Sequence, residues 1–290
     1  MLIAQISDPH VSALEGVADS LLRTSGHLAR AVAHLNRLER RPDLVMITGD
    51  LVDRGEVGEY ERLRELLAPL RMPVFLLAGN HDDRDNLRRV FADHGYLPRA
   101  GLLQYTVDDW PVRLVALDTQ VPGEAGGRLC GERLAWLEAR LAEAPERPTV
   151  VAMHHPPFAL GIPVMDAFGL DGSDRLAAVL RRHPQVERVV CGHLHRPIVR
   201  RFAGTVACTC PSTAHQLALD LPPANRLAFV MEPPACMLHL WLGSDGGLVT
   251  HLSLIAGEHP PFTVHDGRGG SATRSRLRAF IRREVGSSLN

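Results

Sequence analysis

The sequence predicts an α/β protein built on a parallel β-sheet, and three observations lead to this prediction. Short apolar runs, each followed by polar residues, recur along the first two-thirds of the chain. Stretches with apolar residues at helical spacing lie between them. Beyond Pro211, strand-like runs follow one another with no helical pattern between them. Alternating strands and helices are typical of a parallel sheet covered by helices, and the later strands predict a second, antiparallel sheet layer.

Residues 44–50, Leu-Val-Met-Ile-Thr-Gly-Asp, form the run around which the other predicted elements are arranged. Four consecutive apolar residues indicate a strand that is buried on both faces. Gly49 allows a tight turn or the close approach of another group, because it has no Cβ. Asp50 then lies at the carboxyl end of the strand, where open α/β sheets place their ligand sites.

Four further apolar runs end in the same way. The polar residues are Asp8 and His10 after strand 2–6, Asn80 and His81 after strand 74–77, His154 and His155 after strand 149–153, and His193 and His195 after strand 188–190. A single aspartate at such a position is often a helix N-cap, and a single histidine is more often structural than a ligand. Because five such motifs occur together, we expect their side chains to meet at one edge of the sheet.

The remaining elements follow from periodicity and turn residues. Helices are expected at 18–40, 57–67, 85–94, 131–143, 174–182 and 275–285, an antiparallel pair at 102–107 and 112–117, a strand at 227–231 and a hairpin at 236–242 and 248–254. The Pro/Gly-rich loop 156–172 is long enough for a lid or binding loop. We divide the chain into a core at 1–210, a strand and hairpin segment at 211–262 that completes the second sheet and supports assembly, and a basic, solvated tail at 263–290.

Composition limits the classes of function. The 290 residues include 45% hydrophobic and 22% charged residues, and the net charge of -1 gives no electrostatic reason to expect a nucleic-acid polymer or a membrane as partner. The chain begins in a predicted strand without a signal sequence, so a cytoplasmic location is expected. Five scattered cysteines do not indicate a disulfide framework. Cys208 and Cys210 form a C-x-C pair. The pair is either a site for a soft metal or two small residues on one strand face. We favour the second interpretation, because no further cysteine pair is present to complete a tetrahedral metal site. The absence of lysine excludes a Schiff-base mechanism.

The strand-end side chains together suit a metal centre. The proposed ligands are Asp8, His10, Asp50, Asn80, His154, His193 and His195. Three oxygen donors and four imidazoles favour Zn, Mn, Fe or Co over calcium. Seven ligands are too many for one ion and suit two ions that share a bridging carboxylate. Two ions about 3.5–4 Å apart can hold the attacking and leaving oxygens of an in-line phosphoryl displacement.

The motifs D-x-H, G-D-x-x-D, G-N-H-D, H-H-P-P and G-H-x-H, between residues 4 and 196, resemble those of the calcineurin-like metallophosphoesterase superfamily. The G-N-H-D-D form, the later P-S-T-A-H-Q segment and the hairpin are similar to bacterial class III cyclic-nucleotide phosphodiesterases and related glycerophosphodiesterases. This resemblance implies a four-layer αββα sandwich and a dinuclear site. It also implies hydrolysis of small phosphodiesters, such as 3',5'-cyclic AMP or a glycerophosphodiester, by in-line attack of a hydroxide held at the metals.

The resemblance assigns a role to each motif residue. It places Asp8, His10 and His195 at one ion, Asn80, His154 and His193 at the other, and Asp50 as the catalytic bridge between them. Asn80 and His81 would contact the substrate, and His81 would stabilise charge on the phosphoryl group or protonate the leaving alkoxide. Asp53 fits a role outside the ligand set, and His155 one in shaping its loop. A lid disulfide found in some relatives is not matched, because residues 51–75 contain no cysteine.

Two alternatives stay open at this point. The segment 49–55 with Arg54 also resembles protein Ser/Thr phosphatases, which would make the protein a phosphomonoesterase. Those enzymes, however, carry an arginine before G-N-H, where this chain has Ala78. Some relatives are non-catalytic metal-bound scaffolds, but every expected ligand is present here. The exposed strand edges expected in 211–254 also predict a homodimer or a higher homo-oligomer.

Overall fold

Strand β1 (Leu2–Ile6) lies in the middle of a five-stranded sheet. The computed structural model describes residues 1–12, 17–221 and 226–255. In this sheet β1 pairs in parallel with β2 (Leu44–Thr48), and β2 pairs in parallel with β3 (Val74–Leu77). Every residue of β1 and β2 is buried, so the prediction of a strand covered on both faces is confirmed.

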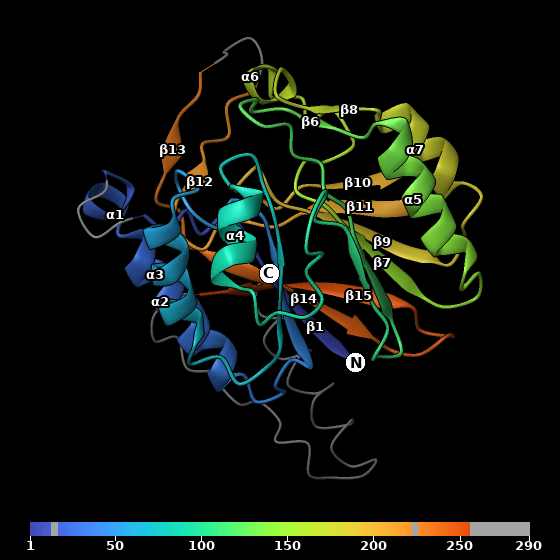
Figure 1. The fold of residues 1–290 in the computed structure, drawn as a ribbon, viewed down its shortest axis with the longest axis horizontal. Coiled ribbons are helices and arrows are strands. Elements are labelled where there is room, and N and C mark those ends of the chain that lie inside the picture. The colour runs from blue at the N-terminus through green and yellow to red at the C-terminus, as the bar shows by residue number, and fades with distance from the viewer. Residues whose placement is uncertain (13–16, 222–225, 256–290) are drawn as a thin grey trace, which may run out of the picture. The chain divides into compact units, whose positions relative to one another are not determined.

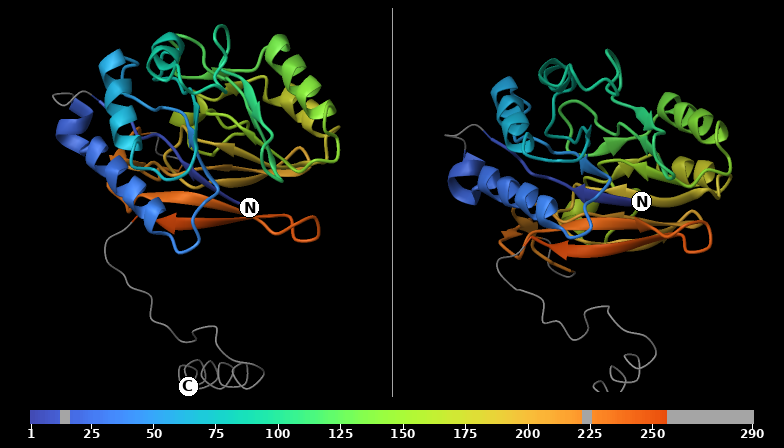
Figure 2. Two further views of the ribbon diagram at one scale, coloured as in Figure 1. Left: turned by 60° about the horizontal axis from the view of Figure 1, so that its bottom comes forward. Right: turned by 90° about the horizontal axis from the view of Figure 1, so that it is seen from below.

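The C-terminal hairpin, β14 (Ala235–Trp241) and β15 (Leu248–Leu254), extends this same sheet. Its two strands are antiparallel, as predicted, and β14 pairs antiparallel with β1. Figure 2 shows the orange hairpin beside the N-terminal strand. The expectation that this segment adds a second, antiparallel sheet layer is wrong, because the hairpin joins the sheet that contains β1. The paired residues of β1 and β14 are more than 230 positions apart in the sequence. Periodicity predicts that β14 is a strand, but it does not predict which strand β14 pairs with.

A six-stranded sheet contains the other half of the fold. Its strand order is β10 (Val199–Phe202), β11 (Thr205–Thr209), β9 (Val186–Cys191), β7 (Thr149–Ala152), β5 (Arg113–Ala116) and β4 (Tyr105–Val107). The four central strands are parallel, and the outer strands β4 and β10 are antiparallel to their neighbours. The predicted antiparallel pair around residue 109 is thus confirmed as β4 and β5.

The two sheets pack face to face between two layers of helices (Figure 1). Helices α2 (Thr24–Arg37) and α3 (Val57–Leu67) lie outside the first sheet, and α5 (Gly131–Ala142) and α7 (Ser173–Leu180) lie outside the second. Alternate residues of β7 show the arrangement, because Val150 packs in the core between the sheets and Val151 packs in the cluster under α5 and α7. The predicted αββα sandwich is confirmed.

Several predicted boundaries differ from the observed ones. The helix expected at 18–40 is two helices, α1 (Val17–Leu22) and α2, separated by Arg23 with a φ of 52°. The Asp19 carboxylate accepts a hydrogen bond from the Ser25 N–H at 2.8 Å and so stabilises the start of α2 after the break. Helix α4 (Arg84–Val90) is shorter than the expected helix 85–94, and Asp83 caps its N-terminus.

The segments near the site contain short elements. The loop 156–172 includes α6 (Pro163–Asp166) and β8 (Leu170–Asp171), and β8 pairs in parallel with β6 (Gly127–Arg128). The strand expected at 227–231 is reduced to β13 (Phe229–Val230), which pairs with β12 (Gln216–Leu217). The predicted helix 275–285 and the basic tail lie outside the described residues. No described helix is long and apolar enough to cross a membrane.

Candidate metal centre

The predicted ligands all follow parallel strands, at the carboxyl ends of both sheets. Asp8 and His10 follow β1, Asp50 follows β2, Asn80 follows β3, His154 follows β7, and His193 and His195 follow β9. The side chains of all except Asn80 belong to buried residues, and Asn80 is partly exposed. The packing of the two sheets therefore brings together seven side chains that are spread over 188 positions of the sequence.

Left-handed backbone geometry marks the same residues. Among described residues, seven other than glycine have positive φ, and five of them are predicted ligands: Asp8, His10, Asp50, His193 and His195. Such conformations are uncommon for residues with a Cβ, and they gather at functional sites, where the surrounding structure holds them in place. The strand-end loops are therefore built to aim these side chains at a common point.

The glycines of the motifs allow the loops to approach each other closely. A Cβ on Gly79 would collide with the side chain and backbone nitrogen of Asp50. Gly49 has a φ of 94°, and a Cβ there would collide with the ring of His154. The sequence predicts close approach at Gly49, and the structure identifies the imidazole that makes this necessary.

The first predicted ligand set forms one cluster. The Nε2 atom of His10 lies 3.1 Å from Nε2 of His195 and 3.6 Å from a carboxylate oxygen of Asp50. Nε2 of His195 lies 3.5 Å from Oδ1 of Asp8. Ligand atoms that share an ion at about 2.0–2.2 Å are separated by about 2.8–3.6 Å. The spacing of these atoms therefore fits a common cation.

The second set meets the first at Asp50. Nε2 of His154 lies 3.4 Å from Oδ1 of Asp50 and 3.1 Å from Oδ1 of Asn80. The rings of His154 and His193 pack edge to face with centroids 5.1 Å apart. Since Asp50 is near His10 through one oxygen and near His154 through the other, its carboxylate lies between the two sets.

Backbone carbonyls select the tautomers of three of these histidines. The Nδ1–H groups of His195 and His154 donate to the carbonyls of His215 and Thr48, at 3.0 and 2.8 Å. The Nε2–H group of His193 donates to the carbonyl of Phe168 at 3.2 Å. The other nitrogen of each ring is the one that can ligate a metal ion, as is usual for metal-binding imidazoles.

The electrostatics of the cluster also fit a cation. Burial lowers the pKa of His154, but the charges of Asp50 and Asp8 outweigh this effect and raise the pKa to about 9. Burial raises the pKa of Asp8 to about 7, to which the charge of Asp50 contributes. Buried carboxylates and imidazole lone pairs that face one another repel unless a positive charge lies between them. A divalent ion at each set supplies that charge, so the donor set fits two metal ions.

His81 and Asp53 lie beside the cluster. The Nδ1–H of His81 donates to the backbone carbonyl of Asp53 at 2.8 Å, and the His81 backbone N–H donates to Asp50 at 2.9 Å. The His81 ring packs edge to face on His10 with centroids 4.7 Å apart. The Asp53 carboxylate lies 3.9 Å from Nδ1 of His10. The backbone carbonyl of Asp53 thus orients the His81 ring, a contribution that the sequence does not reveal.

His155 is adjacent to a predicted ligand but has other partners. Its Nδ1 accepts a hydrogen bond from the Thr119 hydroxyl at 2.8 Å, and its Nε2–H donates to the carbonyl of Ala125 at 3.1 Å. The ring lies close enough to His154 and His193 to count as a possible ligand by distance. Because both of its nitrogens are engaged by protein groups, the contacts agree with the predicted role in shaping the loop.

Sequence reasoning missed two residues that support the centre. His215 immediately precedes β12 and lies against the first set, with its ring centroid 4.6 Å from that of His195. Asp118 follows β5 and is fully buried, and the guanidinium of Arg84 donates to both of its oxygens at 2.6 and 2.7 Å. Asp118 could have been found, because the apolar run 114–117 that precedes it ends in a carboxylate as the other motifs do.

The pair formed by Arg84 and Asp118 joins the two sheets beside the site. Arg84 begins α4, directly after the G-N-H-D-D motif, whereas Asp118 lies two residues beyond the end of β5 in the other sheet. Gln120 is part of the same network, since its backbone carbonyl accepts from Arg84 at 2.8 Å and its side chain contacts the carbonyl of Asp82. The Asp82 carboxylate accepts from the backbone N–H groups of Leu51 and Gly79 at 3.1 and 2.8 Å. These contacts hold the loops that carry Asp50 and Asn80 together.

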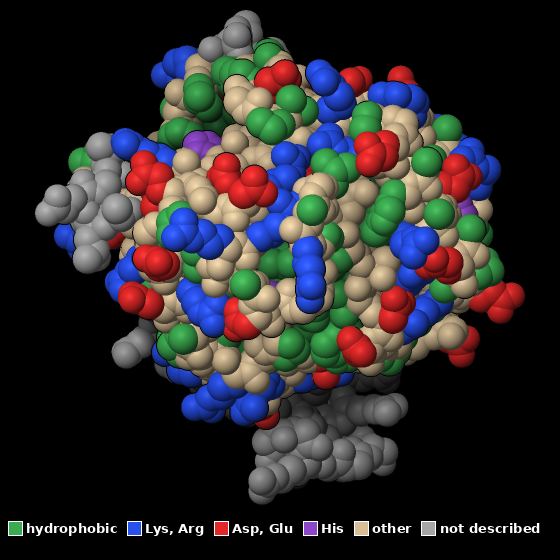
Figure 3. Space-filling model, in the orientation of Figure 1, with side chains coloured by type: hydrophobic (Ala, Val, Ile, Leu, Met, Phe, Trp, Pro, Cys, Tyr) green, Lys and Arg blue, Asp and Glu red, His purple; other side chains and the backbone are tan. Residues whose placement is uncertain are grey.

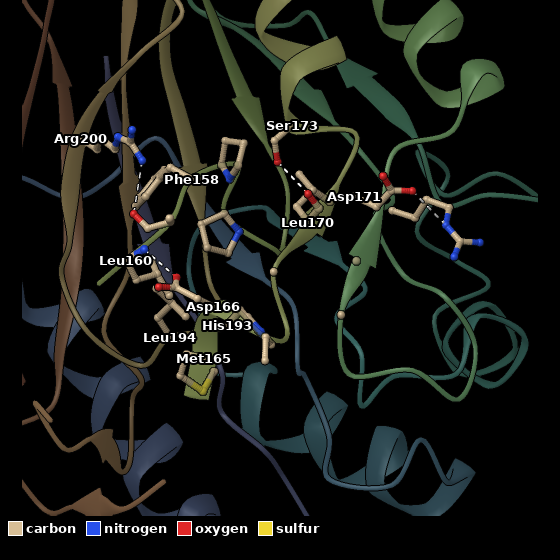
Figure 4. A pocket seen from close by; sticks show the side chains of 18 of the residues that line it. Phe158, Leu160, Met165, Asp166, Leu170, Asp171, Ser173, His193, Leu194 and Arg200 are labelled. Atoms are coloured by element: carbon tan, nitrogen blue, oxygen red, sulfur yellow. Dashed lines mark hydrogen bonds and ion pairs between the residues drawn. The ribbon is translucent and has the colours of Figure 1, made fainter. Parts of the chain in front are cut away.

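Three cavities adjoin the centre. One of about 490 Å³ lies over both ligand sets, and one of about 540 Å³ shares Asn80 and His81 with it. A third of about 630 Å³ shares Met165 and His193 with the first and is lined largely by the loop 156–172. Figure 4 shows this third cavity, in which Asp166 binds the backbone of Leu160. Space for a small substrate is therefore available directly at the cluster.

Residues 1–197 match the calcineurin-like phosphoesterase family. The chain belongs to this family. It is 35% identical over 270 residues, 93% of this chain and 98% of the relative, to a probable glycerophosphodiester phosphodiesterase of Arcobacter nitrofigilis. It is 34% identical over 257 residues, 88% of this chain and 90% of the relative, to a 3',5'-cyclic adenosine monophosphate phosphodiesterase of Pseudomonas aeruginosa.

The calcineurin-like fold is also found by structural comparison. A dimetal phosphatase from Danio rerio superimposes with a TM-score of 0.59 and covers 88% of this chain and 99% of its own, at 15% sequence identity. At this identity the likeness concerns the fold alone. The family match together with the phosphodiesterase relatives identifies the protein as a hydrolase.

Proposed function

We propose that the protein uses two divalent metal ions, Mn, Fe, Zn or Co, to hydrolyse small phosphodiesters. The observation that carries this proposal is the position of Asp50, whose two oxygens lie 3.4 Å from His154 and 3.6 Å from His10. A carboxylate between two imidazole-rich sets is the arrangement that a bridging ligand requires. Two bound ions would act as Lewis acids and align the attacking and leaving oxygens in an in-line displacement at phosphorus.

The residues around the ligand sets would bind and protonate the substrate. Asn80 and His81 line the cavity over the centre, where a phosphoryl group would lie. Because Nδ1–H of His81 donates to the Asp53 carbonyl, Nε2 is the nitrogen left for a substrate oxygen. Burial lowers the pKa of His81, but the charge of Asp50 contributes to a net rise. A protonated His81 can give a proton to a departing alkoxide, a contribution of about 10²–10⁴-fold.

Diesters are favoured over monoesters by two observations. The relatives with substantial identity carry the names of glycerophosphodiester and cyclic-nucleotide phosphodiesterases. A monoester dianion calls for extra cationic contacts, and the position before G-N-H is the buried Ala78. Arg54 supports the phosphomonoesterase alternative, because it lines the neighbouring cavity, but its side chain is 64% exposed and lies 3.9 Å from Asp53.

A metal-activated substrate comparison tests this proposal. Protein stripped of metal would be reloaded with Mn, Fe, Zn or Co and assayed with 3',5'-cyclic AMP, glycerophosphoethanolamine, bis(p-nitrophenyl) phosphate and p-nitrophenyl phosphate. We expect activity to depend on added metal and kcat/KM to be higher for diesters than for the monoester. A preference for the monoester would reject the diesterase proposal, and full activity after complete metal removal would reject the metal centre.

The expected partners are small phosphodiesters and a second copy of the chain. Figure 3 shows arginine and acidic side chains interspersed over the visible face, so this face offers no basic surface for a nucleic-acid polymer.

Strand β15 lies at the edge of its sheet, where Leu252 and Leu254 are 49% and 52% exposed. Unpaired edges with apolar side chains favour association, so we propose at least a homodimer; sedimentation as a monomer at micromolar concentration would contradict this.

We also propose a cytoplasmic location. All five cysteines are free, and four of them, including Cys208 and Cys210, are buried. Free cysteines agree with a reducing compartment. Fractionation of the native host, with the protein detected by antibody, would test this proposal.

A further inference from the structure

The cavity over the metal centre is lined by two chemically different groups of residues. The polar group contains five of the predicted ligands, His10, Asp50, Asn80, His193 and His195, together with Asp53, His81 and His215. The apolar group includes Met165, Phe168, Leu194, Leu217, Leu227 and Phe229, which we call the apolar wall. These residues come from the loop 156–172, from the segment after β9 and from the pair β12 and β13. The wall is therefore assembled from separate segments around the mouth of the site.

The apolar wall has a buried base and an exposed rim. Met165, Leu194 and Leu217 are buried and pack with one another in a single cluster. Phe168 and Phe229, by contrast, are 37% and 53% exposed. The base holds the wall in place, whereas the rim leaves two aromatic rings open to the cavity. Exposed apolar groups that border a cavity mark binding sites for apolar parts of ligands.

Aromatic contacts connect this rim directly with the ligand sets. The ring of Phe229 packs edge to face on His215 with centroids 4.8 Å apart, and it lies 5.8 Å from the ring of His195. A planar group attached to a phosphoryl group at the metal centre would therefore be within reach of Phe229. The backbone of Phe229 is fixed by its pairing with Leu217 in β12.

The residues that line the cavity also favour some groups of the substrate over others. Among the described residues that line it there is no Ser, Thr, Tyr, Gln or Arg side chain. A glycerol arm placed against the apolar wall would lose hydrogen bonds to water without gaining replacements. A planar aromatic ring would bury its apolar faces there and would stack on phenylalanine.

We propose that the apolar wall is a subsite for the aromatic ring of the substrate, so that the preferred diesters carry a nucleobase or an aryl group. This proposal rests on the proposed phosphodiesterase function and names its substrate class. It separates the two diester classes suggested by the relatives, because it ranks cyclic nucleotides above glycerophosphodiesters. Phe229 is a specificity residue in this view, with Leu227 beside it.

Steady-state kinetics of Phe229→Ala test the proposal. Stacking of a base on an aromatic side chain is commonly worth about five- to hundredfold in affinity. We expect KM for 3',5'-cyclic AMP to rise by that factor with kcat little changed, whereas KM for glycerophosphoethanolamine stays the same. Phe229→Trp retains a flat ring and should keep the wild-type preference. Leu227→Ala provides a second variant, with a smaller rise in KM for cyclic AMP.

Met231→Ala is the matched control. Met231 is 53% exposed, like Phe229, and lies two residues further along the same segment, but it does not line the cavity. Its loss should leave both KM values unchanged. Equal changes for the two substrates in Phe229→Ala, or none, would overturn the proposal. A change in sedimentation without a selective rise in KM would instead assign Phe229 to a subunit interface.

Product binding separates this proposal from the proposed function. Calorimetry of the metal-loaded protein with 5'-AMP and with glycerol 3-phosphate requires no turnover. Phe229→Ala should weaken binding of 5'-AMP about five- to hundredfold and leave glycerol 3-phosphate unaffected. If no diester is hydrolysed, the proposed function fails, yet this difference would still support the aromatic subsite. If diesters are hydrolysed and Phe229→Ala binds 5'-AMP normally, the subsite proposal alone is wrong.

Discussion

Replacement of Asp50 with asparagine should weaken the binding of both metal ions. Asp50 is only 3% exposed, and its two oxygens lie 3.6 and 3.4 Å from the nearest nitrogens of His10 and His154. Removal of one partner from a buried charge pair costs about 3–5 kcal/mol, which corresponds to a 10²- to 10⁴-fold rise in Kd at about 1.4 kcal/mol per factor of ten. The amide keeps an oxygen to accept the His81 backbone N–H, bonded at 2.9 Å, so the fold should persist.

Dialysis against graded metal concentrations, followed by metal analysis, would measure this loss at both positions. Asp53→Asn is the matched control, because its carboxylate lies 3.9 Å from His10 and 26% of its side chain is exposed, so less than a tenfold change is expected. Asn80→Ala removes a neutral donor and should weaken the second ion by about tenfold, which added metal would restore. Retention of two ions by Asp50→Asn at near wild-type affinity would refute the bridging role.

Three further predictions concern catalysis and stability. His81→Ala should keep both ions and lower kcat for cyclic AMP by about two to three orders of magnitude, with a smaller loss for nitrophenyl diesters; equal losses would indicate charge stabilisation. Asp118→Asn leaves Arg84 without its buried counter-charge and should lower the free energy of unfolding by about 3–5 kcal/mol in urea titrations. An unchanged urea midpoint would show that the pair of Arg84 and Asp118 does not stabilise the fold. Burial lowers the pKa of His239 to about 3, so its stabilising contribution is complete above pH 6.5 and declines as pH falls below that value. Between pH 6.5 and 5.5, measured with chelator present, the free energy of unfolding of His239→Gln should fall by about 1 kcal/mol less than that of wild type, because the unfolded-state histidine is already half protonated at pH 6.5. Identical acid sensitivity would contradict this assignment.

The strand-end motifs could be predicted from the sequence because each depends on neighbours in the chain. An apolar run such as 44–47 is buried whatever its partners are, and a polar residue after it falls at the carboxyl end of the strand. The same rule would have found Asp118 after β5, had the run 114–117 been treated like the others. The break at Arg23 was missed because apolar spacing continues through it, whereas the backbone turns at one left-handed residue.

Long-range contacts decided the rest. Periodicity shows that β14 has a face to bury, but its pairing with β1 depends on which sheet edge is open after the core has packed. Carbonyls from other segments select which nitrogen of His154, His193 and His195 can ligate a metal ion. The apolar wall has no motif, since Met165 and Phe229 meet only where α6 and β13 are brought to the same cavity. Local sequence patterns place the seven predicted ligands at strand ends, because an apolar run and the polar residues after it are neighbours in the chain. The spacing, protonation and apolar surroundings of these side chains depend on segments far apart in the chain, so they become defined only when the two sheets pack together.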